Sequence, residues 1–240
     1  MDRGLYIAAS GMLAELARQD QLANDLANTS TPGYKADRSA QSSFADALIV
    51  NERTGAAIGS LPYGTAISAV QTDLSQGAFK ETGEPLDLAL DGDGFFAVKA
   101  PAGVRYTRDG QFSPDAKGTL VNASGYPVLD DKGSPVVVTG TSSPTIGPDG
   151  TVTVSGKAVA KLAVVALEGA HKEGDTLFSG KPGAAPKETS VRQGYLEASA
   201  VNVAQAMVDM ITSMRAYEST QRVIHAIDET LGRGINGTTQ

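Results

Sequence analysis

The sequence offers few side chains that could carry out catalysis or hold a metal ion. Its 240 residues include two histidines and no cysteine, which excludes disulfides, thiolate zinc sites and cysteine nucleophiles. His171 and His225 supply too little material for a histidine triad or a histidine metal site. The spacing indicates no nucleophile beside a base and no pair of carboxylates. We therefore expect no catalytic residue, no cofactor and no metal site.

Two patterns could be mistaken for ligand sites. Gly92-Asp93-Gly94-Phe95-Phe96-Ala97 matches the loose G-x-G-x-x-A pattern of dinucleotide-binding loops, which requires a helix to begin at the loop. The following residues, up to Pro101, are typical of a strand, so a hairpin turn is favoured. The series Met207, Met210 and Met214 could bind a soft metal, but packing of adaptable side chains in a helical core explains it more simply.

Charge and hydropathy exclude further classes of protein. Lys and Arg total 20 against 27 Asp and Glu, a net charge of -7 that does not suit binding to a phosphate backbone. We expect no nucleic-acid partner. No apolar run approaches the roughly 20 residues of a transmembrane helix, and the first residues lack the apolar segment of a Sec-type signal peptide.

Apolar residues at both ends of the chain repeat with alternate spacings of three and four, the repeat of a coiled-coil seam. Between Tyr195 and Leu231 there is no Gly or Pro, and near the N-terminus Thr31-Pro32-Gly33 ends the pattern. Because such helices are not stable alone, we expect both seams to form an assembly interface. Its predicted residues are Leu5, Ala9, Met12, Leu16, Leu26, Val203, Met207, Met210, Met214, Tyr217, Ile224 and Leu231.

The middle of the chain has a different character. Most of the 27 glycines and 11 prolines lie between Gly77 and Gly194, where turn signals separate short runs of Val, Leu and Thr. We expect a hairpin around residues 91–94 and a buried strand over 161–167. Residues 36–50 could extend the first helix or form a short second one, and 51–64 is typical of an extended linker.

These patterns predict an α+β fold in which long N- and C-terminal helices pair as a coiled coil around a central antiparallel all-β domain. The predicted segments are an N-terminal assembly helix over 1–35, to which the family resemblance described below adds export, an extended linker over 36–76, a β-rich middle domain over 77–193 and a C-terminal assembly helix over 194–240. The protein is therefore interpreted as structural.

Four blocks of sequence resemble the bacterial flagellar rod and hook proteins. They are the run 23–35, the stretch 86–96, the motif 106–110 and the C-terminal stretch 194–218, in the family's order. The length and the short segment between Tyr34 and Gly77 resemble a proximal-rod member more than a distal-rod member. The residues that carry the family motif are Asn24, Asn28, Thr31, Pro32, Gly33, Tyr34, Asn202 and Val203.

The resemblance implies a structural subunit of the flagellar basal-body rod. Subunits of this family polymerise through their terminal helices into a helical tube, which transmits torque and passes exported subunits. It further implies that the partners are other rod proteins and copies of the chain. Export through the flagellar type III apparatus, without a cleaved signal peptide, would place the protein in the rod within the cell envelope and periplasmic space.

Two readings from other classes stay open. The first is a secreted β-domain enzyme acting on polysaccharides, carried on a helical oligomerisation stalk. Saccharide sites usually contain aromatic platforms, and this chain has no Trp. The second is an adhesin or binding module with a coiled-coil stalk.

Overall fold

The computed structural model describes residues 2–44, 47–50, 57–61, 64–138, 143–174, 176–184, 186 and 188–237. The chain forms two compact units. The helical unit consists of Met1–Ala27, Asp37–Gln71 and Asn202–Gln240, and the β unit consists of Asn28–Ala36 and Thr72–Val201. Both helices and the antiparallel strands agree with the predicted α+β class.

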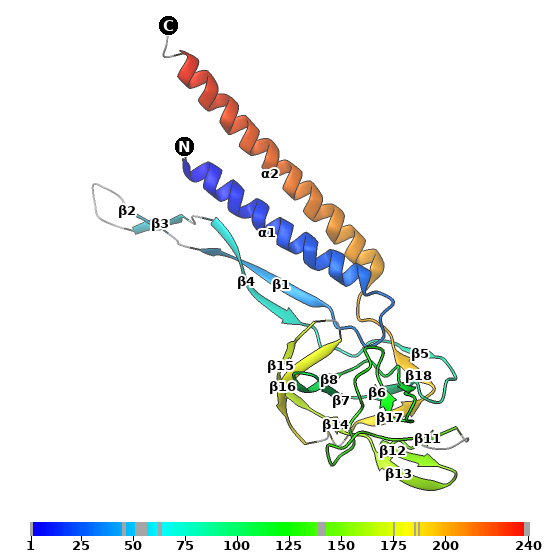
Figure 1. Cartoon of the computed structure of the whole chain (residues 1–240). Helices are drawn as coiled ribbons and strands as arrows, with labels where there is room; N and C mark the ends of the chain where they lie inside the picture. The colour runs from blue at the N-terminus through cyan, green and yellow to red at the C-terminus, as the bar shows by residue number, and fades with distance from the viewer. Residues whose placement is uncertain are drawn as a thin grey trace. The chain divides into compact units, whose positions relative to one another are not determined.

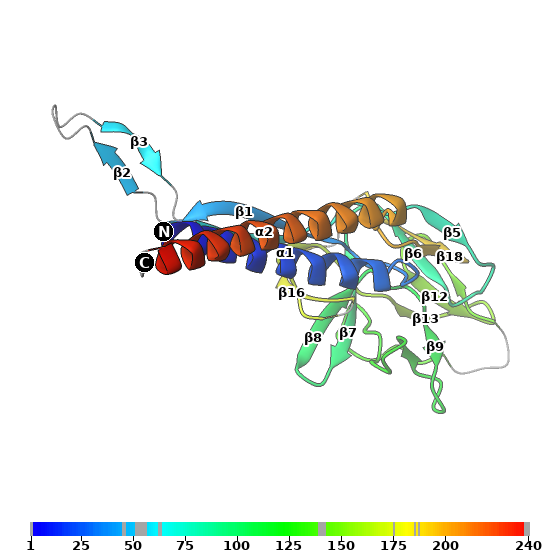
Figure 2. The ribbon, with the colours of Figure 1, turned by 90° about the horizontal axis from the view of Figure 1, so that it is seen from above.

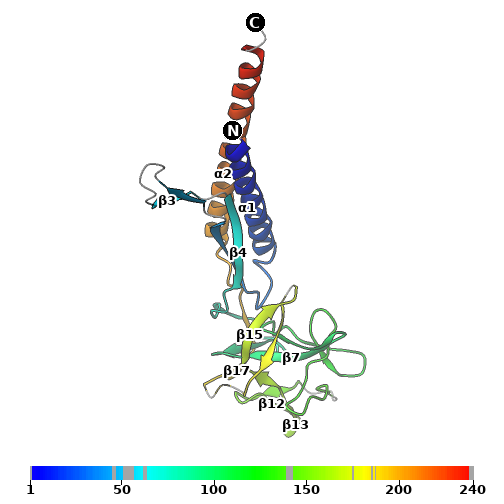
Figure 3. The same ribbon diagram turned by 90° about the vertical axis from the view of Figure 1, so that its left-hand side faces the viewer.

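The helical unit is built on α1 (Asp2–Ala27) and α2 (Val203–Gly237), which lie side by side and antiparallel (Figure 1). The last turns of α2 extend past the N-terminus of α1 (Figure 3). Helix α1 ends where predicted, just before Thr31-Pro32-Gly33. Helix α2 begins later than predicted, because Asn202 caps it: its Oδ1 accepts a hydrogen bond from the Gln205 N–H at 3.2 Å.

The helical unit also contains two pairs of strands. Strand β1 (Asp37–Phe44) pairs with β4 (Gly64–Thr72) (Figure 1), and β2 (Ala47–Val50) pairs with β3 (Ala57–Leu61) (Figure 2). A helix over 36–50 was therefore a wrong prediction, since the described residues there are strands. Long-range pairing with β4 overrides the weak local signal of this segment. Part of the predicted linker, residues 51–56, 62 and 63, lies outside the described residues.

The β unit contains the remaining strands, arranged in small antiparallel sheets. The largest has the order β14-β7-β8-β16-β15, and a three-stranded sheet has the order β11-β12-β13. The remaining sheets pair β18 with β5, β17 with β6, and β10 with β9. The strands are β5 (Phe79–Glu81), β6 (Leu88–Asp91), β7 (Phe95–Ala100), β8 (Gly103–Thr107), β9 (Ser113–Pro114), β10 (Leu120–Val121), β11 (Thr145–Ile146), β12 (Thr151–Val154), β13 (Lys157–Lys161), β14 (Val164–Val165), β15 (Leu167–Lys172), β16 (Leu177–Pro182), β17 (Ser190–Gln193) and β18 (Tyr195–Glu197).

Strand β7 is covered on both faces, because successive side chains of a strand point to opposite sides. Phe96 and Val98 face the larger apolar core, which also contains Leu88, Leu120 and Val152. On the other side, Phe95 and Ala97 pack with Tyr106, Leu129 and Phe178. Because both faces of β7 are buried, successive residues of the strand are apolar, which explains the continuous apolar run from Phe95 to Val98.

Two predictions for the β unit were wrong in detail. Residues 91–94 do form a turn, but β6 pairs with β17 and β7 pairs with β8, so the turn joins different sheets and no hairpin forms. The predicted strand over 161–167 is divided among β13, β14 and β15, because each piece pairs with a different neighbour. Pairing partners depend on distant segments, which the local pattern does not specify.

Candidate assembly interface

The contact between α1 and α2 is formed by small and polar residues. Ser213 is buried, and its hydroxyl donates hydrogen bonds to the Glu15 backbone carbonyl at 3.3 Å and to its carboxylate at 2.6 Å. Nearer the chain termini, a Cβ on Gly4 would lie 3.5 Å from Ile227 Cδ1, so the backbone of α1 comes close to α2. Ala8 and Ala206 are also buried. The pair therefore depends on close approach and hydrogen bonds rather than on a large apolar seam.

A second apolar surface lies on α2 and is left uncovered. We call it the outer patch; its residues are between 42% and 56% exposed and comprise Val203, Met207, Val208, Ile211 and Met214. At 100° per residue, Ile211 lies on nearly the opposite side of the helix from Ser213 and Thr220. Further along α2, the same side carries exposed charged residues, Arg215, Glu218 and Arg222. The outer patch is thus confined to the N-terminal part of α2; further along the helix Val223 is also exposed, at 49%.

Helix α1 contributes apolar side chains beside β4. A groove of about 360 Å³ is lined by Tyr6, Leu13 and Ala14 from α1 and by 65–67 from β4. The Ser10 hydroxyl accepts a hydrogen bond from the Thr65 N–H at 3.2 Å, which ties the helix to the strand. Leu13 is 68% exposed at this groove. The helical unit therefore presents apolar surface on both helices.

The predicted seam residues divide into two sets. Half-buried in the structure are Leu5, Met12, Leu26, Met210, Tyr217, Ile224 and Leu231. Exposed are Ala9, Leu16, Val203, Met207 and Met214. The seam inferred from apolarity therefore mixed two faces of α2, because the buried Ala206 and Ser213 gave no strong apolar signal. That all twelve residues contact other subunits stays a prediction.

The sequence motifs at the two ends and in the middle of the chain meet in one buried ionic cluster of the β unit. Lys35 Nζ lies 2.5 Å from Glu197 Oε1, and Arg108 Nη1 lies 3.2 Å from Glu197 Oε2. Each of the three side chains is at most 3% exposed. The Gly77 N–H also donates to Glu197 Oε1 at 2.8 Å, so this carboxylate is well satisfied. One carboxylate thus joins three distant parts of the chain.

The N-terminal motif is seated tightly against the middle of the β unit. The Gly33 N–H donates to the Glu197 carbonyl at 2.8 Å, and Gly33 has a φ of 66°. A Cβ there would lie 2.3 Å from the Arg108 carbonyl carbon, so only glycine fits. Tyr34 is buried beneath Lys172, whose ammonium lies 3.9 Å from the ring centroid.

Of the other named motif residues, Asn28, Thr31 and Pro32 belong to the β unit, and Asn24, Asn202 and Val203 belong to the helical unit. Thr31 donates from its hydroxyl to the Asn28 side chain at 3.0 Å. Pro32 is half-buried and Asn24 is exposed on α1, whereas Asn202 caps α2 and Val203 begins it. The motif thus combines residues that end one helix, begin the other and enter the β unit.

Burial controls the electrostatics of the β unit. Desolvation lowers the pKa of Lys35, and its hydrogen bond to Glu197 opposes that shift. Burial also raises the pKa of Asp109 from 3.8 to about 6; the backbone hydrogen bond from Gln111 opposes this, and the charge of Asp87 adds to it. The ionic cluster of Lys35, Arg108 and Glu197 is stable only with all three partners present, because removing one of them would leave a buried charge without compensation.

Lys35, Arg108 and Glu197 lie inside the sequence motifs, but no role was predicted for them from the sequence. The only signal was a charged residue inside each of three turn- or strand-forming motifs, and it was weak because charged residues are most often exposed. A single sequence does not reveal that these charges meet. Among the described residues, no group of three potential ligands could hold a metal ion, and no helix is long and apolar enough to cross a membrane.

The fold and these surfaces define a structural protein that presents paired terminal helices for association. Family models match three segments of the chain. They are the flagella basal body rod protein model over residues 5–35, the flagellar hook protein FlgE/F/G D1 domain over 89–154 and the flagellar basal body rod FlgEFG protein C-terminal model over 192–237.

Nearly full-length relatives give the same result. The chain is 34% identical to the flagellar basal-body rod protein FlgF of Caulobacter vibrioides, with 93% of each chain covered. It is 31% identical to FlgG of Bacillus subtilis, covering 98% of this chain and 99% of the relative. It is 35% identical to FlgG of Agrobacterium fabrum, covering 95% and 96%. The chain belongs to the family of flagellar basal-body rod proteins and is a structural rod subunit of the FlgF/FlgG type.

Proposed function

We propose that the chain polymerises into the rod through the outer patch of α2, which packs against terminal helices of neighbouring subunits. The observation that carries this proposal is the run of exposed Val, Met and Ile side chains on a helix whose other face already contacts α1. Covering each half-exposed side chain contributes roughly 1 kcal/mol. Methionine suits such a surface, because its flexible side chain adapts to more than one neighbour.

In the assembled rod the helices form coiled-coil contacts, and the predicted seam residues of both helices lie in these contacts. The subunits build a tube that transmits torque and through which exported subunits pass. The partners are copies of the chain and other rod proteins. The flagellar type III apparatus exports the chain to the periplasmic part of the basal body. The four predicted segments describe these roles, with residues 1–35 and 194–240 acting in assembly.

We further propose that the chain is the FlgF-type, proximal-rod member. The alignment with the Caulobacter FlgF spans 235 residues, whereas those with two FlgG relatives span 261 and 266, longer than this chain of 240 residues. The two FlgG alignments therefore place more gaps in this chain than the alignment with the Caulobacter FlgF does. Expression in flgF and flgG deletion strains of a relative tests the assignment: we expect motility to return only in the flgF strain, and rescue of the flgG strain alone would contradict it.

The variant Ile211→Asp tests the outer patch. Ile211 is exposed in the single chain, so the free energy of unfolding should change by less than about 0.5 kcal/mol. Polymerisation should be lost, because an unpaired carboxylate buried at a subunit contact costs several kcal/mol. The measurements are thermal unfolding of the monomer, sedimentation of polymers and swimming.

The matched control is Ser219→Asp, which adds the same charge at an exposed position of α2 outside the outer patch. It should polymerise nearly normally. If Ile211→Asp polymerises with normal yield, the outer patch is not part of the assembly contact.

A further inference from the structure

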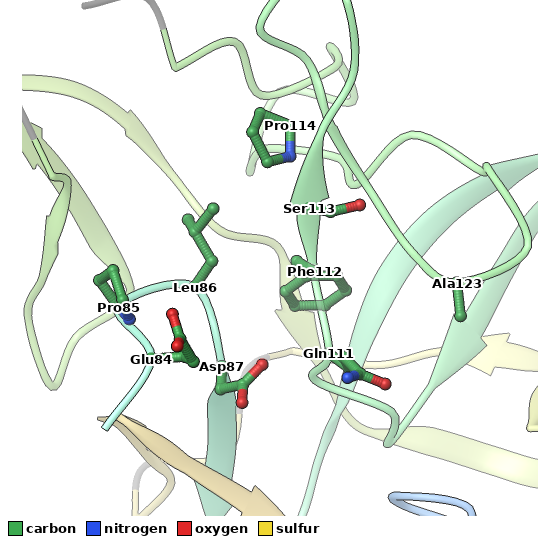
Figure 4. Close-up of a pocket in the computed structure, with 9 residues that line it drawn as sticks. All are labelled: Glu84, Pro85, Leu86, Asp87, Gln111, Phe112, Ser113, Pro114 and Ala123. Atoms are coloured by element: carbon green, nitrogen blue, oxygen red, sulfur yellow. The ribbon is translucent and has the colours of Figure 1, made fainter. Parts of the chain in front are cut away.

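A cavity of about 320 Å³ in the β unit combines an apolar wall with two carboxylates (Figure 4). It lies between the segment 84–87, which leads into β6, and the segment 111–114, which leads into and includes β9. The wall is formed by Pro85, Leu86, Phe112, Pro114 and Ala123, and the polar groups belong to Glu84, Asp87, Gln111 and Ser113.

Asp87 is the notable member of this cavity. It is only 7% exposed, yet no donor among the described residues makes a hydrogen bond to its carboxylate. Its backbone is bridged to Gln111, which places the two side chains on the same face, and Figure 4 shows its carboxylate pointing toward that segment. In the described part of the chain its oxygens are not among the buried side-chain atoms that lack a partner, so they are open to the cavity, where a cation would gain charge-assisted hydrogen bonds.

The shape and chemistry of the cavity indicate which cation fits. No set of three ligating side chains occurs in the described part of the chain, so a bare metal ion would be poorly coordinated here. An alkylammonium group suits the cavity better, because its methylene stem can lie along Leu86 and Phe112 while its head reaches the carboxylates.

The chain itself presents such groups. Two tight turns share the pattern Asp-x-Lys-Gly, at residues 115–118 and 130–133. The Asp115 carboxylate accepts from the Lys117 N–H at 2.8 Å, and the Asp130 carboxylate accepts from the Lys132 N–H at 3.0 Å. Both lysines are exposed on backbones held by these hydrogen bonds, which lowers the entropy lost when they bind.

We propose that this cavity is a receptor for a lysine side chain, Lys117 or Lys132, from a second copy of the chain. The inference rests on the proposed function, because it requires subunits to lie side by side. It adds a polar, register-setting contact between β units to the apolar contact between helices. The carboxylates of Asp87 and Glu84 would bind the ammonium group, and Gln111 and Ser113 would accept its remaining hydrogen bonds.

The first test uses the monomeric full-length chain and does not depend on polymerisation. N-acetyl-lysine N-methylamide is titrated while the NMR signals of Leu86, Gln111 and Ser113 are followed, with the norleucine analogue as the uncharged probe. We expect saturable shifts with the lysine probe and binding at least tenfold weaker with norleucine. If the two probes bind equally, or if the shifts caused by the lysine probe do not saturate, the assignment of the cavity as a lysine receptor is overturned.

Three variants make this test specific. Asp87→Asn should weaken binding of the lysine probe at least tenfold, and Glu84→Gln, at an exposed position, should weaken it severalfold without affecting folding. Asp131→Asn removes the same charge outside the cavity and should bind as the native chain does. Undiminished binding by both cavity variants would overturn the assignment.

The second test identifies the source of the lysine. A mixture of ¹⁴N- and ¹⁵N-labelled chains is polymerised and treated with a carbodiimide, which joins carboxylates to amines without a spacer. We expect mixed-isotope cross-links between the segment 81–99 and a peptide containing Lys117 or Lys132. If the monomer binds the lysine probe but polymers yield no mixed-isotope cross-link, the second copy is excluded as the source. Failure to polymerise would instead count against the proposed function.

Discussion

At the scale of single residues, the β unit contains buried charges of two kinds. Glu197 is compensated by Lys35, Arg108 and a backbone N–H, so its charge is well satisfied. Asp109 is not paired with a cation in any contact of the described residues; it accepts a hydrogen bond from the Gln111 N–H at 3.0 Å and lies near the charge of Asp87. The two carboxylates should therefore respond in opposite ways to neutralisation.

Neutralising Glu197 should be strongly destabilising. In Glu197→Gln, two buried cations lose their counter-charge, and we expect the free energy of unfolding to fall by about 3–5 kcal/mol. Urea denaturation of the full chain measures this, and Glu188→Gln, at an exposed position, serves as the control. A loss below about 1 kcal/mol would show that the ionic cluster contributes little.

Neutralising Asp109 should be stabilising, but only above acidic pH. Because its pKa rises from 3.8 to about 6 on folding, the folded state favours the protonated form, and stability is lost as pH rises through that interval. Asp109→Asn should therefore resemble the native chain near pH 3.5 and be more stable at pH 7 by up to about 3 kcal/mol. Urea midpoints at the two pH values test this; an equal difference at both would contradict it.

At the scale of elements, the segment 28–36 belongs to the β unit although it follows directly on α1. Its residues Tyr34 and Lys35 are among the largest fully buried side chains, and the Tyr34 carbonyl accepts a hydrogen bond from the Ala200 N–H at 3.0 Å. The part of the family motif from Asn28 to Tyr34 is thus a structural part of the β unit, in addition to any role in export or assembly.

Two truncations separate these contributions. A chain of residues 28–201 retains the whole β unit, whereas 36–201 lacks the buried Tyr34 and Lys35. We expect the shorter chain to be less stable by at least about 3 kcal/mol, through an empty cavity and an unbalanced Glu197. Equal urea midpoints of the two chains would refute a structural role for this segment.

At the scale of the whole molecule, the two units differ in what they bury. The β unit has two apolar clusters of buried side chains, whereas the buried residues described in the helical unit are small or polar: Ala8, Ala14, Asp25, Gly64, Ala206 and Ser213. A unit with so little apolar burial should open at a lower free energy than its neighbour.

Hydrogen exchange on the monomer should therefore show weaker protection in α1 and α2 than in β7 and β8. Polymerisation should raise the protection of the helices far more than that of the strands, because new subunit contacts cover the helices. Strong protection of both helices in a verified monomer would contradict an assembly-dependent helical unit.

The local character of each part of this protein could be predicted from its residues. Apolar spacing without Gly or Pro specified the helices, frequent turn residues specified the β unit, and Thr31-Pro32-Gly33 specified the end of α1. These features were predictable because helix periodicity, turn formation and the ending of a helix at proline are determined by residues close together in the sequence. The family motifs were equally visible, since they are contiguous in sequence.

Which surfaces and charges meet became apparent from the packing of the folded chain. It assigned Ser213 to the contact with α1 and left Met207 exposed, although periodicity alone ranked Met207 higher. It paired β1 with β4 across a segment that gave no clear local signal. It also brought Lys35 against Glu197, which lies 162 residues away. The physical reason is that pairing and burial depend on packing between distant segments, and one sequence specifies the faces of its elements but not their partners.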